Sequence, residues 1–201
     1  MNTVLTSKTR SSLANVVTGS GYSLNVPKYV AWGSGISNAS ATDVALFNPI
    51  GSPISGTVST FATSTSGDTF LNTVTLTASG LYQITELGLF DTKIAPPVGA
   101  LTSQVNPGDT IVTLSGYGNF TSAFPFNIQV SQEVMLVTSG NGSNVFNVIR
   151  GANGSSMMTS IIPSFTQVVG TSGFMFLKSS FAPIGLQYGD SIQFNVSLQF
   201  I

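Results

Sequence analysis

The sequence has no histidine and no cysteine among its 201 residues. Without these side chains the chain cannot build a Cys/His zinc site, a disulfide, a thiol nucleophile or a Ser-His-Asp triad. It also has no Walker phosphate loop and no dinucleotide-binding fingerprint. We therefore expect a protein that is not an enzyme, with no catalytic residue, no cofactor, no metal ligand and no small-molecule substrate.

Charge is almost as scarce, because only 13 residues are charged: six Lys or Arg and seven Asp or Glu. A monomer of 20.8 kDa exposes roughly 9,000 Å², so each charged side chain would serve roughly 700 Å² of surface. Soluble domains carry a far higher density of charge. A freely soluble monomer is thus disfavoured, and the lack of a Lys/Arg cluster argues against a nucleic-acid partner.

Long apolar runs are missing too. No stretch approaches the 18 consecutive apolar residues of a membrane-spanning helix, although the mean hydropathy is +0.35. Near the N-terminus, Lys8 and Arg10 are followed by Ser11, Ser12 and Asn15, which interrupt any signal-peptide core. We expect no membrane partner, and we expect the excess apolar surface to be buried between subunits.

Short alternating runs separated by Gly, Asn, Asp and Pro dominate the chain and predict an all-β protein. The clearest runs are residues 73–77 and 191–200. The opposite face of the second run carries only amide and hydroxyl groups, so it can meet a partner without desolvating ions. Its apolar residues share one face of a half-buried strand: Ile192, Phe194, Val196, Leu198 and Phe200.

One helix is predicted over residues 7–17. Thr6 or Ser7 is suited to cap its start, and Gly19 is suited to end it. Its apolar stripe is partial and consists of Leu13, Val16 and Val17.

A Gly-Asp phrase opens three strand-like runs, at residues 67–68, 108–109 and 189–190. Glycine supplies the turn dihedral, and the Asp side chain can accept a hydrogen bond from its own following backbone. A calcium site would need further acidic residues nearby, which the sequence lacks. The phrase therefore predicts turns.

The composition changes after Asp91. Residues 93–99 (KIAPPVG) are typical of a linker, and residues 170–173 form a second loose stretch. We interpret residues 96–170 as a small inserted β-domain, and residues 1–95 with 171–201 as a host domain with a β-sandwich or jelly-roll-like fold. Within the insert, strands are predicted over residues 110–114, 126–130, 133–138 and 145–150, with turns at Asn141-Gly142 and 151–154.

Paired carboxylates are the remaining route to catalysis. Glu86 and Asp91 are the nearest acidic pair, but a spacing of five places them on opposite faces of a strand. A glycosidase can bring distant carboxylates together, so this alternative stays open. We interpret Glu86 as a strand-end residue paired with a backbone amide or a lysine. Tyr29, Trp32 and Tyr82 are interpreted as core and interface residues rather than a sugar-stacking platform.

Four phrases follow one another along the chain: residues 28–35 (KYVAWGSG), 41–46 (ATDVAL), 84–91 (ITELGLFD) and 189–194 (GDSIQF). Their ordered series resembles small head-associated virion proteins of tailed bacteriophages. The TELGLFD phrase alone is similar to one shared by phage tail-collar and fibre-type proteins.

The insert is similar to a second module that recurs inside phage virion proteins. The matching residues are 108–112 (GDTIV), 126–130 (FNIQV), 133–135 (EVM) and 148–154 (VIRGANG). One departure is clear: the module usually carries a histidine after its Arg-Gly turn, and Met157-Met158 stands there instead.

The resemblance implies a structural protein of the virion, assembled in the bacterial cytoplasm. Its simplest form is a capsid decoration (cement) protein that binds the major capsid protein as a homotrimer. Two alternatives are a tail collar, fibre or adaptor component, and a host-glycan-binding or depolymerising virion protein. Scarce charge fits a surface covered by sister copies and a shell. We expect turns, rims or specific pairs to hold Glu86, Asp91, Lys93, Arg150 and Lys178.

Overall fold

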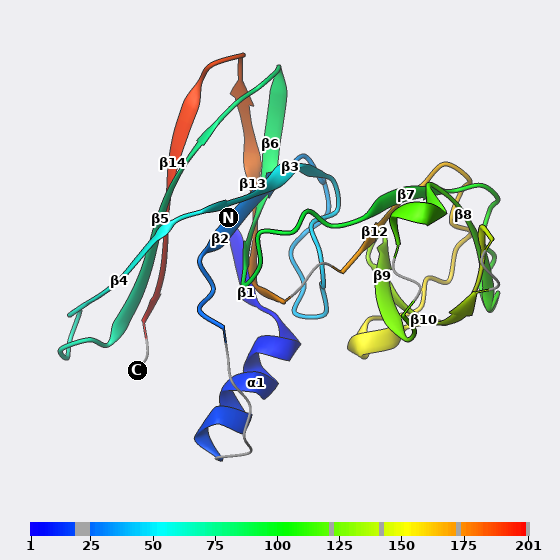
Figure 1. Cartoon of the computed structure of the whole chain (residues 1–201), viewed down its shortest axis with the longest axis horizontal. Coiled ribbons are helices and arrows are strands. Elements are labelled where there is room, and N and C mark those ends of the chain that lie inside the picture. Colours follow the sequence, from blue (N-terminus) through cyan, green and yellow to red (C-terminus); the bar gives the residue numbers. More distant parts are fainter. Residues whose placement is uncertain (19–24, 121–122, 141–142, 172–173, 200–201) are drawn as a thin grey trace.

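The computed structural model describes residues 1–18, 25–120, 123–140, 143–171 and 174–199. The predicted all-β fold class is confirmed, since the described residues form fourteen strands, one α-helix and two short 3-10 helices. The strands make a five-stranded sheet, a three-stranded sheet and a closed six-stranded barrel (Figure 1).

The two open sheets form a sandwich. The larger has the order β1 (Asn2–Leu5), β13 (Met175–Leu186), β6 (Tyr82–Phe90), β2 (Tyr29–Gly33) and β3 (Pro49–Ser55). The smaller has the order β14 (Ser191–Gln199), β5 (Thr69–Thr77) and β4 (Thr57–Phe61). All neighbouring strands are antiparallel. One hydrophobic cluster joins the two sheets, with Trp32 and Leu89 from the larger and Val74 and Leu76 from the smaller.

Two connections link the sheets at one end of the sandwich, from β5 to β6 and from β13 to β14 (Figure 1). They also bond to each other: the Gly189 amide donates to the Ala78 carbonyl over 2.8 Å, and the Ala78 amide donates to the Asp190 carbonyl over 2.8 Å. A third connection passes from β3 of the larger sheet to β4 of the smaller one through Gly56.

The alternation predicted for residues 191–200 is confirmed over β14. The strand pairs with β5 without a register break, from Ser191 opposite Thr77 to Gln199 opposite Thr69. Its even-numbered apolar residues are half-buried and its odd-numbered polar residues are exposed. Phe200 lies outside the described residues.

Helix α1 (Ser7–Val17) has the predicted bounds, and Thr6 caps it by accepting from the Thr9 amide. Its predicted apolar stripe is wrong, because the buried residues are Thr9 and Ser12, whereas Val17 is 86% exposed. The helix docks through hydroxyl groups: Thr9 Oγ1 donates to the Phe176 carbonyl over 2.7 Å. The predicted end at Gly19 falls outside the described residues.

The barrel lies between β6 and β13 in the chain and has its own core of thirteen buried residues. Its order is β10 (Glu133–Gly140), β11 (Val145–Ile149), β8 (Ile111–Ser115), β7 (Val98–Leu101), β12 (Gln167–Gly170) and β9 (Phe126–Val130). Strand β9 matches the predicted bounds, and the other three predicted strands differ by one or two residues. The turn at residues 151–154 is present, with the 3-10 helix Ala152–Gly154, while Asn141-Gly142 lies outside the described residues.

The chain enters and leaves the barrel at adjacent points. The Gly170 amide donates to the Pro97 carbonyl over 2.9 Å, and the Phe174 amide donates to Asp91 Oδ1 over 2.8 Å. Gln129 of β9 then ties the barrel to the sandwich. Its Oε1 accepts from the amides of Val44 (3.1 Å) and Ala45 (3.2 Å).

Candidate functional site

Lys178 of β13 is the centre of a buried ionic cluster. Its Nζ lies 3.2 Å from Asp43 Oδ2 and 3.2 Å from Glu86 Oε2, and it donates to the Ala45 carbonyl over 3.3 Å. The same Nζ lies 3.2 Å from the centroid of the Phe47 ring, which gives a cation–π contact. The three charged side chains are at most 1% exposed, so no substrate reaches them.

Backbone amides donate the remaining hydrogen bonds that the Glu86 carboxylate can accept. Its Oε1 accepts from the amides of Gly35 (3.1 Å) and Asn48 (2.8 Å), and its Oε2 accepts from the amide of Phe47 (3.0 Å). A buried carboxylate is tolerated only when its oxygens are paired in this way. The cluster therefore fixes the loop between β2 and β3 onto the middle of the larger sheet.

Two glycines make room for this contact. A Cβ at Gly35 would lie 2.6 Å from Glu86 Oε1, and a Cβ at Gly33 would collide with the same oxygen. Residues 28–35, 41–46 and 84–91, which carry the phage resemblance, thus meet at one place through Gly35, Asp43 and Glu86. These phrases therefore help to build the buried part of the larger sheet.

The sequence interpretation of Glu86 is partly wrong. Its predicted partners, backbone amides and a lysine, are both present, but it lies in the interior of β6 and not at a strand end. Because β6 is central in the larger sheet, with β13 and β2 on either side, a carboxylate there needs internal partners. The sequence did not identify Lys178 as the partner, because the two residues are far apart along the chain.

A second ion pair, between Arg150 and Glu133, closes one end of the barrel. Arg150 binds both carboxylate oxygens, with Nε to Oε1 at 2.6 Å and Nη2 to Oε2 at 2.7 Å. The Glu133 carboxylate also accepts from the amides of Gly151 and Met158, each at 3.0 Å. Burial raises the Glu133 pKa, but these hydrogen bonds and the Arg150 charge outweigh it and hold the pKa below its ordinary value.

Met158 stands in the segment where the phage module that this part of the chain resembles usually carries a histidine. Here the contribution to the ion pair is a backbone amide, which any residue other than proline supplies. The Met158 side chain is partly buried against the barrel core, and Met157 is 45% exposed.

The three Gly-Asp phrases form turns, as predicted, and Gly67, Gly108 and Gly189 have φ values of +74°, +87° and +87°. The predicted partner of the Asp side chain is wrong, because the backbone amide that donates to it precedes the Asp in the chain instead of following it. Asp109 accepts from the amide three residues before it, over 2.7 Å, and Asp190 does the same over 2.8 Å.

Asp68 is the most heavily hydrogen-bonded of these three carboxylates. It accepts from the amides of Thr63 (2.8 Å), Ser64 (2.8 Å) and Thr65 (2.9 Å). These donors hold the pKa of Asp68 well below its ordinary value, because they stabilise only the ionised form.

All seven carboxylates of the chain thus have internal partners. Three form the ion pairs with Lys178 and Arg150, three close Gly-Asp turns, and Asp91 accepts from the Phe174 amide. Glu86 and Asp91, the candidate pair for acid–base chemistry, engage separate partners and share none. Within the described ranges, no group of three or more potential metal ligands gathers.

The basic residues divide in the same way. Arg150 and Lys178 occupy specific ion pairs, as expected, while Lys93 is exposed just before the barrel. The acidic residue Asp91, also expected at a turn or rim, directly follows β6. Lys8 and Lys28 lie over the rings of Phe174 and Tyr29, at 5.3 and 5.4 Å from the centroids.

The aromatic residues considered for a sugar platform are largely internal. Trp32 is 5% exposed, and its ring centroid lies 6.4 Å from that of the half-buried Tyr82. Tyr29 is half-buried against a small cluster in the larger sheet. None of these three rings is fully exposed, and the largest of them, Trp32, is buried.

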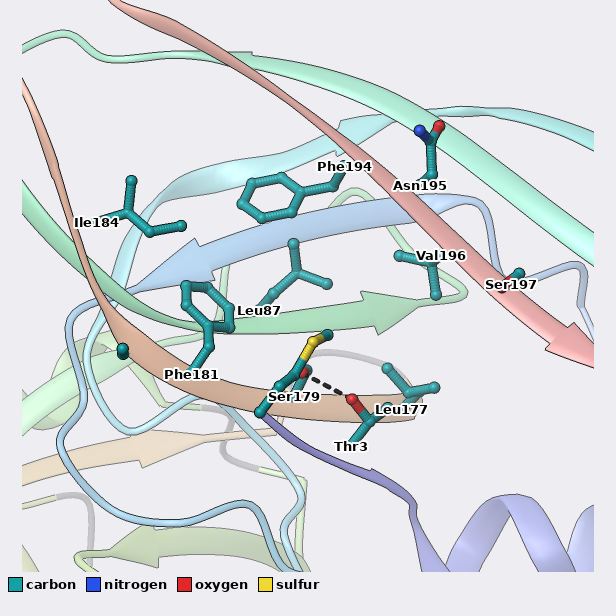
Figure 2. A pocket seen from close by; sticks show the side chains of 12 residues that line it. Thr3, Leu87, Leu177, Ser179, Phe181, Ile184, Phe194, Asn195, Val196 and Ser197 are labelled. Carbon is teal, nitrogen blue, oxygen red and sulfur yellow. Dashed lines mark hydrogen bonds between the residues drawn. The ribbon is translucent and has the colours of Figure 1, made fainter.

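An apolar groove of about 540 Å³ lies between β14 and the β1–β13 edge of the larger sheet. Figure 2 shows Phe194 turned into it from β14 and Phe181 from β13, while Asn195 points away. The ring centroids of Phe181 and Phe194 lie 6.1 Å apart. None of the described residues that line the groove has a charged side chain, and most are apolar, so it suits an uncharged apolar partner.

Among the described residues, no helix has the length and hydropathy that crossing a bilayer requires. Comparison with protein-family models gives no match for this chain, and comparison with curated proteins gives none either.

Proposed function

We propose that the chain is a structural protein of a tailed-phage virion, most simply a capsid decoration protein. It would bind the major capsid protein on the assembled head and contact sister copies, in the homotrimer that the resemblance implies. The observation that carries the proposal is the internal use of all seven carboxylates. With them committed to the fold, the chain keeps no carboxylate for acid–base chemistry.

The exposed surface supports an assembly role. The outward residues of β14 and β5 include Gln193, Asn195, Thr73 and Thr75, which are polar and uncharged. Of the residues that the structure describes, eighteen large hydrophobic side chains are exposed, among them Ile36 (95%) and Tyr188 (82%). Such a surface loses little by desolvation when another protein covers it.

Mass action supplies the mechanism. A protein that binds the assembled shell and not its free subunits shifts the equilibrium toward the shell. The sandwich, with its uncharged sheet face, would contact the shell and the sister copies. The barrel, attached by one adjacent pair of connections, would project outward or touch a neighbouring capsomer.

Heating purified particles with and without the protein tests the proposal. We expect particles that lack it to assemble normally but to release DNA at a lower temperature. Equal release temperatures would contradict a cementing role. Counting copies per particle by mass spectrometry separates the tail alternative, because a head decoration protein is present in hundreds of copies and a collar or adaptor in a handful.

A glycan-directed role is tested by mixing the purified chain with host surface polysaccharide. Retention of the polysaccharide, or its depolymerisation, would support that alternative against the structural one. The internal position of Trp32 and the absence of a free carboxylate argue for a negative result.

A further inference from the structure

Strand β14 is an unprotected sheet edge. It has nine residues, contains no charge and no proline, and pairs with β5 on one side without a bulge. Among the described residues, no strand pairs with its other side. Natural proteins protect such edges with charges, prolines, bulges or short strands, because a long regular edge readily pairs with another chain.

The apolar face of the same strand is only half covered. Phe194 and Val196 line the groove, with Leu177 and Phe181 of β13 and Thr3 of β1 on its other side (Figure 2). The larger sheet has five strands and the smaller has three, so the smaller sheet is too narrow to cover the larger one. A further strand beside β14 would extend the smaller sheet over the groove and bury more of both apolar surfaces.

The sequence of β14 is complementary to itself. In an antiparallel pair centred on Asn195, Phe194 lies opposite Val196 of the partner subunit, and Ile192 lies opposite Leu198 of the partner subunit. Every apolar residue then meets an apolar residue on the groove side, and every polar residue meets a polar one on the outer side. Because β14 carries no charge, the pairing brings no like charges together.

We propose that β14 pairs with β14 of a second copy of this chain, about a twofold axis at Asn195. The two three-stranded sheets become one six-stranded sheet, and both free edges disappear from solvent. Backbone hydrogen bonds would supply affinity, and the half-buried apolar residues would fix the register. This contact deepens the self-association in the proposed function: it is twofold, and so it is separate from the threefold contacts of a trimer.

Single-cysteine cross-linking tests the register, because the natural chain has no cysteine to interfere. In the proposed pair, the two residues at position 195 lie directly opposite each other, with Cβ atoms roughly 5 Å apart. Asn195→Cys is therefore expected to give a covalent dimer under mild oxidation. Ser197→Cys places the two sulfurs about four residues apart along the strands, roughly 13 Å, and is expected to give none.

Ser59→Cys, on the opposite edge of the same sheet, is the matched control and is also expected to stay monomeric on a non-reducing gel. Equal cross-linking at positions 195, 197 and 59 would overturn the proposal, because it would indicate random collision. Cross-linking confined to position 59, or between cysteines at 195 and 59 in a mixture, would also overturn it, in favour of another sheet contact.

A second variant keeps the proposal testable if the cysteine variants fold poorly. Asn195→Lys places two like charges at the axis and is expected to weaken association of the purified chain by roughly tenfold or more in sedimentation experiments. Ser59→Lys is expected to leave association unchanged. Unchanged association of Asn195→Lys, or a natural chain that stays monomeric at all concentrations, would overturn the pairing. Both tests use the free chain, so they fail or succeed independently of binding to phage heads.

Discussion

Lys178 Nζ lies 3.2 Å from Glu86 Oε2 under the loop between β2 and β3, on the face of the larger sheet turned away from the smaller one, and neither side chain reaches solvent. Removal of one partner leaves the other charge buried without compensation, which costs about 3–5 kcal/mol. We therefore expect Lys178→Met to lower the free energy of unfolding by about that amount in urea titrations. Lys93→Met, at an exposed lysine, should leave it unchanged. Equal midpoints for the two variants would show that the cluster contributes nothing to stability.

Gly35 is expected to reject any side chain. A Cβ there would lie 2.6 Å from both Glu86 Oε1 and the Phe47 Cβ, so Gly35→Ala forces the loop away from its carboxylate partner. Overpacking of this kind costs about 1–3 kcal/mol. Gly185→Ala in β13, where nothing lies within 4 Å of the new Cβ, is the matched control. Thermal denaturation of both variants measures the difference, and a Gly35→Ala variant as stable as Gly185→Ala would contradict the steric argument.

The pH dependence of the barrel should follow Glu133. Its pKa is lower in the folded chain than in the unfolded chain, so its ionised form stabilises the fold. That contribution is fully present above the ordinary value of 4.5 and is lost as the pH falls below it. We expect the protection factors of the barrel amides, which correct exchange rates for their intrinsic dependence on pH, to fall below this pH. Glu133→Gln should exchange faster at neutral pH and show a flatter acid response, whereas Gln104→Ala, at an exposed barrel residue, should behave like the natural chain.

Two substitutions in α1 test whether the helix docks through its buried hydroxyl groups or through its apolar residues. Thr9→Val keeps the shape of the side chain but removes its hydrogen bond to the Phe176 carbonyl, which then keeps only the Thr6 amide as a donor. Loss of one such bond costs about 0.5–1.5 kcal/mol. Val17→Thr, on the exposed side, should be neutral. Hydrogen exchange of the α1 amides reports both effects. A larger effect of Val17→Thr than of Thr9→Val would indicate that the helix docks through its apolar stripe instead.

The contrast between α1 and the barrel shows how far local patterns carry a prediction. Strand β9 and the start of α1 follow from alternation and from the Thr6 cap, which are properties of neighbouring residues. The docking face of α1 does not, because it depends on the free carbonyls of β13, a strand more than 150 residues away. The same holds for the partners of Glu86, since no local pattern identifies Lys178 as the cation that reaches it.

Gln129 is the clearest contact that the sequence does not reveal. It was assigned to a strand, and a single glutamine in a strand gives no sign of a distant role. In the structure it is 2% exposed, accepts from the amides of Val44 and Ala45, and donates to Asp43 Oδ1 over 2.8 Å. One side chain of the barrel thus holds the loop that supplies a carboxylate to the ionic cluster.

Gln129→Leu should therefore destabilise the contact between the barrel and the sandwich more than it destabilises the fold of the barrel. The substitution leaves two buried amides and one carboxylate oxygen without their partner, and each lost partner costs about 1–3 kcal/mol. Gln104→Leu, at an exposed position of the barrel, is the control of equal size. We expect hydrogen exchange to rise across residues 40–47 in Gln129→Leu while the core strands of the barrel stay protected. Equal acceleration throughout the barrel would mean that Gln129 supports the barrel fold rather than its junction with the sandwich.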